Sequence, residues 1–226
     1  SCRPSGACGV TGQAVSIVDY GVGNLLSLER ALRHVGAEVT LVRDVRAIRD
    51  AERLVLPGVG AFASCMGELE RRGLKEAVGE FGRGGRPLLG ICVGMQMLFD
   101  GSDEFGSHVG LGIIPGWVRA IPAASSDGRK RKVPHIGWTA LAPAEGATAW
   151  PGGLLKEIAP GACVYFVHSY AVHPTTSGHC VAVCDYDGIS LTAAITDRGV
   201  YGCQFHPEKS GGVGLAILNN FVALPA

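Results

Sequence analysis

Apolar residues recur in short runs that alternate with amphipathic segments over the first hundred positions of the chain. Four runs end in turn residues or glycine, as buried strands do, at residues 14–19, 38–42, 53–56 and 87–91. A helix is expected from Asn24, which can cap it, to about Val35, with Gly36 closing it. A polar helix pair is expected within residues 62–82, and another helix at 93–99. This alternation predicts a parallel sheet flanked by helices.

The pattern changes after about residue 105, where short strands follow one another. They are expected at residues 116–121, 139–141, 162–170, 180–186 and 193–196, as antiparallel strands added to the first half. Residues 200–204 regain the apolar character of the core strands, and residues 214–222 predict a closing helix. No linker is long enough to separate two domains. We therefore predict one α/β domain over residues 14–226, with a mostly parallel central sheet flanked by helices and added antiparallel strands.

The first thirteen residues contain glycine and cysteine but lack the apolar stretch of a signal peptide. We interpret residues 1–13 as a disordered leader or an expression remnant. No apolar run in the chain approaches the roughly 20 residues that span a bilayer. The sequence therefore predicts a cytoplasmic protein with no membrane partner.

Composition narrows the functional classes further. Hydrophobic residues make up 47% of the 226 positions, enough to bury a sizeable core without metals or disulfides. Lys+Arg and Asp+Glu number 20 each, and this balance argues against nucleic acid as the main partner. Four consecutive basic residues lie within residues 125–132. We interpret this segment as a solvated hairpin tip, with contact to an anionic partner or a phosphorylated substrate as the alternative.

The eight cysteines are scattered and form no C-x-x-C pair, so a structural zinc site is not expected. Cys180 and Cys184 have a spacing that could suit a metal, but no second pair accompanies them. Buried free thiols in a reducing compartment are the simpler interpretation. We predict neither a metal nor a cofactor.

The sharpest local signal is the segment Gly90-Ile91-Cys92-Val93-Gly94, which has the form G-x-C-x-G between an apolar strand and a helix. This is the nucleophile-elbow pattern with cysteine in place of serine. A sharp turn lifts the side chain into a cleft, and the positive end of the helix favours thiolate over thiol. The backbone N–H of Val93 would then point to the same space, as an oxyanion donor should. On the pattern alone, a buried core cysteine is the alternative.

A base for this nucleophile is found in Gln204-Phe205-His206-Pro207-Glu208. Pro207 restricts His206 to an extended conformation, in which residues two apart point the same way. Glu208 can then lie beside His206 and fix its tautomer, as the acidic member of a triad does. Alone, H-P-E would more often be a surface histidine beside a glutamate. Together with the elbow, it predicts a triad of Cys92, His206 and Glu208.

These segments resemble class I, or triad, glutamine amidotransferases. Other segments are similar to the glutaminase subunits of imidazole glycerol phosphate synthases, namely D-Y-G-V-G-N (19–24), P-G-V-G-A-F (57–62), V-P-H-I-G-W (133–138) and Y-F-V-H-S-Y (165–170). The resemblance runs from about Ala14 to the C-terminus. It implies that glutamine is hydrolysed through a cysteinyl thioester. It also implies that ammonia passes to a separate (β/α)₈-barrel cyclase subunit, where it reacts with a phosphoribulosyl intermediate of histidine biosynthesis.

The same resemblance implies roles for further residues. Val59 N–H would supply a second oxyanion donor after a rearrangement of its strand. The residues expected to hold glutamine are Gly60, Gln96, Ser169 and Tyr170. The residues expected to face the cyclase are Asn24, Pro134, His135, Ile136, Gly137 and Trp138. Without the resemblance, Trp138 would be interpreted as core and Tyr170 as a strand aromatic.

Three other functions remain open at this level. The first is a related amidotransferase that serves GMP, carbamoyl phosphate or pyridoxal phosphate synthesis, against which the P-H-I-G-W and D-Y-G-V-G-N segments argue. The second is a non-catalytic binding subunit, against which the intact triad argues. The third is a cysteine hydrolase or protease that acts alone.

Overall fold

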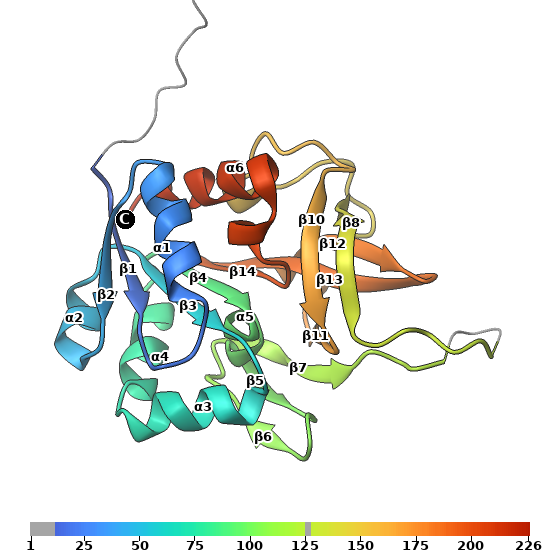
Figure 1. The fold of residues 1–226 in the computed structure, drawn as a ribbon, viewed down its shortest axis with the longest axis horizontal. Coiled ribbons are helices and arrows are strands. Elements are labelled where there is room, and N and C mark those ends of the chain that lie inside the picture. Colours follow the sequence, from blue (N-terminus) through green and yellow to red (C-terminus); the bar gives the residue numbers. More distant parts are fainter. Residues whose placement is uncertain (1–11, 125–127) are drawn as a thin grey trace, which may run out of the picture.

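A central eight-stranded sheet organises the chain (Figure 1), in a computed structural model that describes residues 12–124 and 128–226. Its strand order is β2-β1-β3-β4-β14-β13-β12-β9. The first five strands in this order are parallel, and the last three join antiparallel. The bounds are β1 Ala14–Val18, β2 Glu38–Val42, β3 Leu54–Gly58, β4 Leu88–Cys92, β9 Ala142–Pro143, β12 Cys180–Tyr186, β13 Ile189–Asp197 and β14 Val200–Cys203. The predicted fold class is therefore confirmed.

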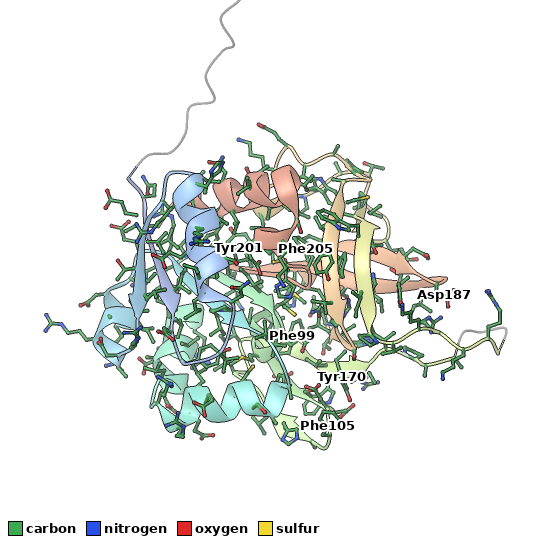
Figure 2. The ribbon with its side chains drawn as sticks, viewed as in Figure 1. Phe99, Phe105, Tyr170, Asp187, Tyr201 and Phe205 are labelled. Atoms are coloured by element: carbon green, nitrogen blue, oxygen red, sulfur yellow. The ribbon has the colours of Figure 1, made fainter. Side chains whose placement is uncertain are left out.

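Helices cover both faces of this sheet. On one face, α1 (Leu25–His34) packs against α6 (Gly211–Val222), as Figure 1 shows. On the other, α2 (Val45–Asp50), α3 (Phe62–Arg71), α4 (Lys75–Arg83) and α5 (Val93–Met97) contact one another in series. The first helix begins after Asn24 as predicted, although the Asn24 side chain makes no capping bond. Its apolar side chains enter a core that includes the fully buried Phe99 and Phe205 (Figure 2).

Two small sheets stand beside the central one and account for most differences from the prediction. One has the order β11-β7-β5-β6, with β5 at Phe99–Ser102, β6 at His108–Val109, β7 at Ile114–Ala120 and β11 at Tyr170–Pro174. The other pairs β8 (His135–Ala140) with β10 (Cys163–His168). The single strand predicted at 162–170 is therefore wrong. It is two strands in different sheets, and the chain changes sheet at Ser169.

The helix predicted at 93–99 is also too long. It ends at Met97, and Phe99 already begins strand β5, which runs parallel to β7. Short 3₁₀ turns complete the chain at Gly153–Leu155, Ser177–His179 and Pro207–Lys209.

Two predictions fall partly on residues 1–11 and 125–127, which lie outside the described residues. They are the leader at 1–13 and the solvated hairpin tip at 125–132. Beside these residues, Ala124 and Lys130 form an antiparallel bridge. One basic residue there is not solvated, because Arg131 is only 2% exposed. Its guanidinium donates to the carbonyls of Pro122 and Ala124 and pairs with Asp187.

Candidate active site

Cys92 is the last residue of β4, at the carboxyl edge of the parallel strands, and α5 begins at the next residue. Its backbone has φ of 54°, a left-handed conformation that is costly for a residue with a side chain. Glycines that flank Cys92 on both sides make this tight turn possible. A Cβ at Gly90 would lie 2.7 Å from the Met95 Cα, and one at Gly94 would collide with the Leu56 carbonyl oxygen. The local geometry is that of a strained nucleophile elbow.

The base approaches the elbow from the segment that follows β14. His206 has an extended backbone, and its Nδ1 lies 2.8 Å from Glu208 Oε1. Both side chains are only 4% exposed. The contact arises differently from the prediction, because Glu208 lies in a 3₁₀ turn that begins at Pro207 rather than in a continuing extended segment. The structure thus places the His206 side chain in contact with both Cys92 and Glu208, which is the arrangement predicted from the sequence.

The charge of His206 depends on its two partners. Burial by itself would lower the pKa of this imidazole. Hydrogen bonds with Cys92 and Glu208, and the negative charges on both, instead raise the pKa of His206 to about 9. Because α5 has only five residues, its N-terminal charge is a smaller influence than a long helix would supply. The imidazolium of His206 is therefore the main positive charge beside the Cys92 sulfur.

A pocket of about 160 Å³ opens over the sulfur. This volume suits a molecule of amino-acid size rather than the larger ligands of pockets of several hundred Å³. The predicted residues that line it are Cys92, Val93, His206, Val59, Gly60, Gln96, Ser169 and Tyr170. The structure therefore collects in one cavity the predicted nucleophile and base, both predicted oxyanion donors and all four predicted glutamine-binding residues.

Glu104 and His168 also line the pocket and were not predicted from the sequence. Glu104 lies in the turn after β5, and its Oε2 accepts a hydrogen bond of 2.6 Å from the Phe62 N–H. His168 is the last residue of β10, and its Nδ1 lies 2.8 Å from the Tyr170 carbonyl oxygen. A further buried residue, Gln204, donates to Cys92 Sγ over 3.7 Å. An isolated acidic or histidine residue in a turn or strand, such as Glu104 or His168, gives no spacing signal of its own.

The residues predicted to face a partner differ in their exposure. Ile136 and Trp138 are 52% and 56% exposed and are available to a partner. His135 is 1% exposed, so the structure places its side chain inside the protein rather than on the surface. Pro134 and Gly137 are partly exposed beside it on the same segment. Asn24 lines a small cavity next to the triad, together with residues that include Val59 and Glu208.

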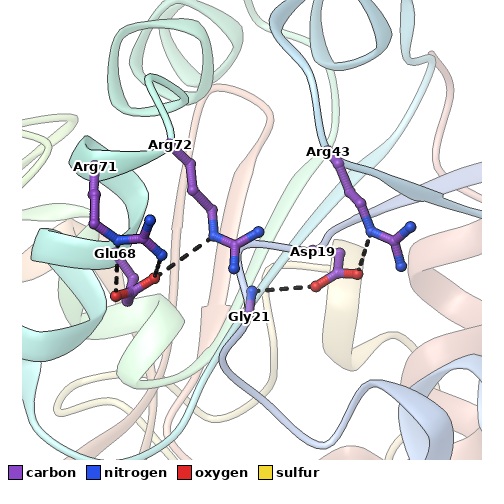
Figure 3. Close-up of polar contacts among 6 residues, drawn as sticks. All are labelled: Asp19, Gly21, Arg43, Glu68, Arg71 and Arg72. Carbon is purple, nitrogen blue, oxygen red and sulfur yellow. Dashed lines mark hydrogen bonds and ion pairs between the residues drawn. The ribbon is translucent and has the colours of Figure 1, made fainter.

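A cluster of charged residues holds the loop 20–24 at the carboxyl edge of the sheet (Figure 3). Asp19 accepts hydrogen bonds from Arg43 at 2.7 Å and from the Gly21 N–H at 3.2 Å. Burial opposes the charge of Asp19, but these bonds hold the pKa of its carboxyl below the ordinary value of 3.8. On the other side of Gly21 lies Arg72, which pairs with Glu68. A Cβ at Gly21 would lie 2.5 Å from the Arg72 guanidinium, so this loop packs closely against α3.

Other kinds of site find little support in the part of the chain that the structure describes. Within residues 12–124 and 128–226, no three His, Cys, Asp or Glu side chains gather as metal ligands. Across the same residues, no helix has the length and apolar character to cross a membrane. Cys184 is buried and Cys180 is partly buried, and burial raises the pKa of both thiols.

Comparisons with known proteins agree with this geometry. The family model for glutamine amidotransferase class-I matches residues 16–224. Imidazole glycerol phosphate synthase subunit HisH 1 of Legionella pneumophila is 47% identical over 93% of this chain and 99% of that protein. Imidazole glycerol phosphate synthase subunit HisH of Geobacter sulfurreducens is 45% identical over 92% of this chain and 97% of that protein.

Solved structures share the fold at lower identity. A structure described as a glutamine amidotransferase has a TM-score of 0.68 at 17% identity, and covers 93% of this chain and 99% of its own. The structure of PurLQS from Thermotoga maritima has a TM-score of 0.67 at 18% identity, with 92% of this chain and 96% of that chain covered. By the family match and the close relatives, the chain belongs to the class-I glutamine amidotransferase family and, within it, to the HisH subunits of imidazole glycerol phosphate synthase.

Proposed function

We propose that this chain is the glutaminase subunit of an imidazole glycerol phosphate synthase, with Cys92 as nucleophile, His206 as acid and base, and Glu208 as its orienter. One observation carries the proposal. The Cys92–His206–Glu208 constellation opens into a pocket of amino-acid size that is lined by the residues expected to hold glutamine. The identity to HisH relatives supports the histidine branch of the family over GMP, carbamoyl phosphate or pyridoxal phosphate synthesis.

The chemistry follows from the charge state of the pair. The Cys92 thiolate attacks the side-chain amide carbon of glutamine, and the His206 imidazolium gives its proton to the departing nitrogen, which leaves as ammonia. A glutamyl thioester remains on the sulfur. Neutral His206 then takes a proton from water, the resulting hydroxide attacks the thioester carbon, and the product carboxyl group leaves as the Cys92 thiolate and the His206 imidazolium are restored. Glu208 stabilises the imidazolium in each half-reaction.

The pocket supplies groups for both ends of the substrate. Glu104 presents a carboxylate to the cavity and can pair with the α-ammonium group of glutamine. Gly60, Gln96, Ser169 and Tyr170 would surround the rest of the molecule. The Val93 N–H follows the nucleophile directly and is the first oxyanion donor, as in other elbows.

Val59 N–H is the proposed second donor, available after a rearrangement of its strand. The two neighbouring glycines differ in freedom. Gly58 is tightly packed, because a Cβ there would lie 2.5 Å from the Gly94 N, whereas Gly60 has φ of 90° and open space around it. The carbonyl of Val59 accepts from Cys65 Sγ at 3.3 Å, and its side chain is 39% exposed. The Val59 N–H belongs to the Gly58–Val59 peptide, so its rearrangement turns the backbone at Gly58 and Val59, and the exposed Val59 side chain is where a partner could act on it.

The partner in this proposal is a (β/α)₈-barrel cyclase that receives the ammonia. Exposed Ile136 and Trp138 on β8 form the apolar part of the docking face, and the Asn24 loop lies beside the triad at the same edge of the sheet. A second oxyanion donor is worth roughly 3 kcal/mol, or a hundredfold and more in rate. The isolated chain should therefore be a poor glutaminase that the liganded cyclase activates.

The test compares glutamine turnover by the chain alone, with the cyclase, and with the cyclase plus a nucleotide analogue of its substrate. We expect the rate to rise at least about a hundredfold between the first and last conditions.

Trp138→Ala should weaken binding to the cyclase and reduce activation. Val109→Ala removes another exposed apolar side chain, from β6, and serves as the control. Equal rates in all three conditions would show that the site is already assembled and that partner gating is mistaken.

A further inference from the structure

The nucleophile has a buried polar neighbour that the proposed mechanism does not use. Gln204 directly follows β14 and is fully buried, and its backbone N–H donates to the Ala193 carbonyl at 2.9 Å. Its side-chain Nε2 lies 3.7 Å from Cys92 Sγ, within reach of an N–H···S hydrogen bond. A glutamine side chain in a core costs free energy unless both ends are bonded. The hydrogen bond made by the Oε1 end of the Gln204 amide should therefore explain why this side chain is buried beside the sulfur.

The orientation of the Gln204 amide is set by a second glutamine. Gln96 Nε2 donates to the Tyr170 carbonyl at 3.1 Å and to Gln204 Oε1 at 3.0 Å. A backbone carbonyl can only accept, so the amino group of Gln96 must face it. The amino group then also meets the oxygen of Gln204. As a result, Gln204 presents its amino group, and not its oxygen, to the sulfur.

The Tyr170 carbonyl is fixed in turn by a pair of histidines. His168 Nδ1 lies 2.8 Å from it and must donate, which leaves His168 Nε2 as the acceptor for His135 Nδ1 at 3.1 Å. His135 Nε2 then accepts from the Thr139 hydroxyl at 2.8 Å. Burial lowers the pKa of each imidazole to about 4, so both rings are neutral at neutral pH and each has one donor and one acceptor. Every bond between Thr139 and Cys92 thus has an assigned direction.

We propose that Gln204 is a further catalytic residue, whose side-chain amide donates a hydrogen bond to the Cys92 thiolate and holds the sulfur toward the pocket. The inference rests on the proposed role of Cys92 as nucleophile. An N–H donor favours the charged sulfur over the neutral thiol. Gln96, His168 and His135 act through Gln204 and are positioning residues in this respect.

The reactivity of the sulfur, measured without glutamine, separates this proposal from the proposed function. Iodoacetamide alkylates a thiolate, and the modified Cys92 peptide can be quantified by mass spectrometry over a range of pH. Gln204→Met removes the donor but keeps an unbranched side chain of similar length. We expect the pH midpoint of alkylation to move upward by about one unit, which corresponds to a charge-assisted hydrogen bond. The kcat/KM for glutamine should fall about tenfold.

Other titratable groups near the sulfur are unchanged in this variant, so they do not contribute to the shift. They are His206, Glu208, Glu104, His168, Tyr20, Cys65 and Cys203. Phe205→Leu is the matched control, because it disturbs the adjacent buried position without touching a polar bond, and its midpoint should stay at the wild-type value. A Gln204→Met midpoint that coincides with wild type would overturn the proposal, while Cys92 could still be the nucleophile.

Folding of the variant is not essential to the test. If Gln204→Met does not fold, the side-chain amide of Gln204 can be followed by NMR in the wild-type protein as pH rises. Movement of one amide proton together with the onset of Cys92 alkylation supports the hydrogen bond. Amide resonances that do not change over that range contradict it.

Discussion

Replacing Glu208 with glutamine removes one buried negative charge from the triad but keeps the side-chain size and an oxygen that can accept from His206. The two groups meet at 2.8 Å with both side chains 4% exposed, so solvent screens the contact little. A hydrogen bond to a charged group contributes about 1.5–3 kcal/mol, against about 1 kcal/mol for a neutral one. The change should therefore remove about 1–2 kcal/mol of preference for the imidazolium.

This loss converts to about one pKa unit, at 1.36 kcal/mol per unit. Burial already opposes the charge of His206, and its bonds with Cys92 and Glu208 raise its pKa to about 9. In Glu208→Gln the pKa should fall to about 8. The direction of the effect on activity follows from the chemistry, since the protonated ring must deliver a proton to the departing ammonia. Activity should decline as pH rises through the His206 pKa.

The assay is the pH dependence of kcat for glutamine with the cyclase present. We expect kcat to decline with rising pH near pH 9 in the wild type and about one pH unit lower in Glu208→Gln. The plateau value of kcat in Glu208→Gln should be about ten- to a hundredfold below that of the wild type. Glu145→Gln removes a charge from an exposed position and should leave the limb in place. The reasoning is refuted if the basic limb of Glu208→Gln coincides with that of the wild type.

Three further outcomes are expected. His206→Ala should lower kcat more than Glu208→Gln does, since an orienter matters less than the base, and steady-state rates with the cyclase decide the order. Gly94→Ala should destabilise the fold by about 3 kcal/mol in urea unfolding, because its Cβ would meet the Leu56 carbonyl, whereas Gly178→Ala has open space and should be nearly neutral. Asp19→Asn should change stability by less than about 1 kcal/mol yet weaken cyclase binding in calorimetric titration. Acid should weaken that binding only below about pH 4, because the Asp19 pKa is depressed.

Much of the site was predictable because its signals are local in sequence. The elbow at Cys92 combines a strand end, a turn and two glycines within five residues, and His206 and Glu208 are two residues apart. Alternating strands and helices likewise predicted the parallel half of the sheet. The short helix Val45–Asp50 was missed although it has a local signal, since the Asp44 side chain accepts from the Ala47 N–H at 2.9 Å.

The rest depends on pairing between distant segments. The apolar run at 162–170 reads as one strand, but its first part pairs with β8 and its continuation with β7, so only the tertiary structure determines the break at Ser169. Glu104 reaches the pocket from a turn that the short helix α5 and strand β5 position. Gln204 did carry a signal, because a long polar side chain lies between the apolar strand β14 and Phe205. Its partners, however, are more than a hundred residues away along the chain.

Steady-state glutamine hydrolysis by Cys92→Ala, in complex with the liganded cyclase, decides whether Cys92 is the nucleophile. Far-ultraviolet circular dichroism and urea unfolding would first establish that the variant folds. We expect its rate of glutamate formation to fall by at least about 10⁴-fold, because the covalent route requires the sulfur at the elbow. A folded Cys92→Ala variant that retains wild-type turnover would contradict the account.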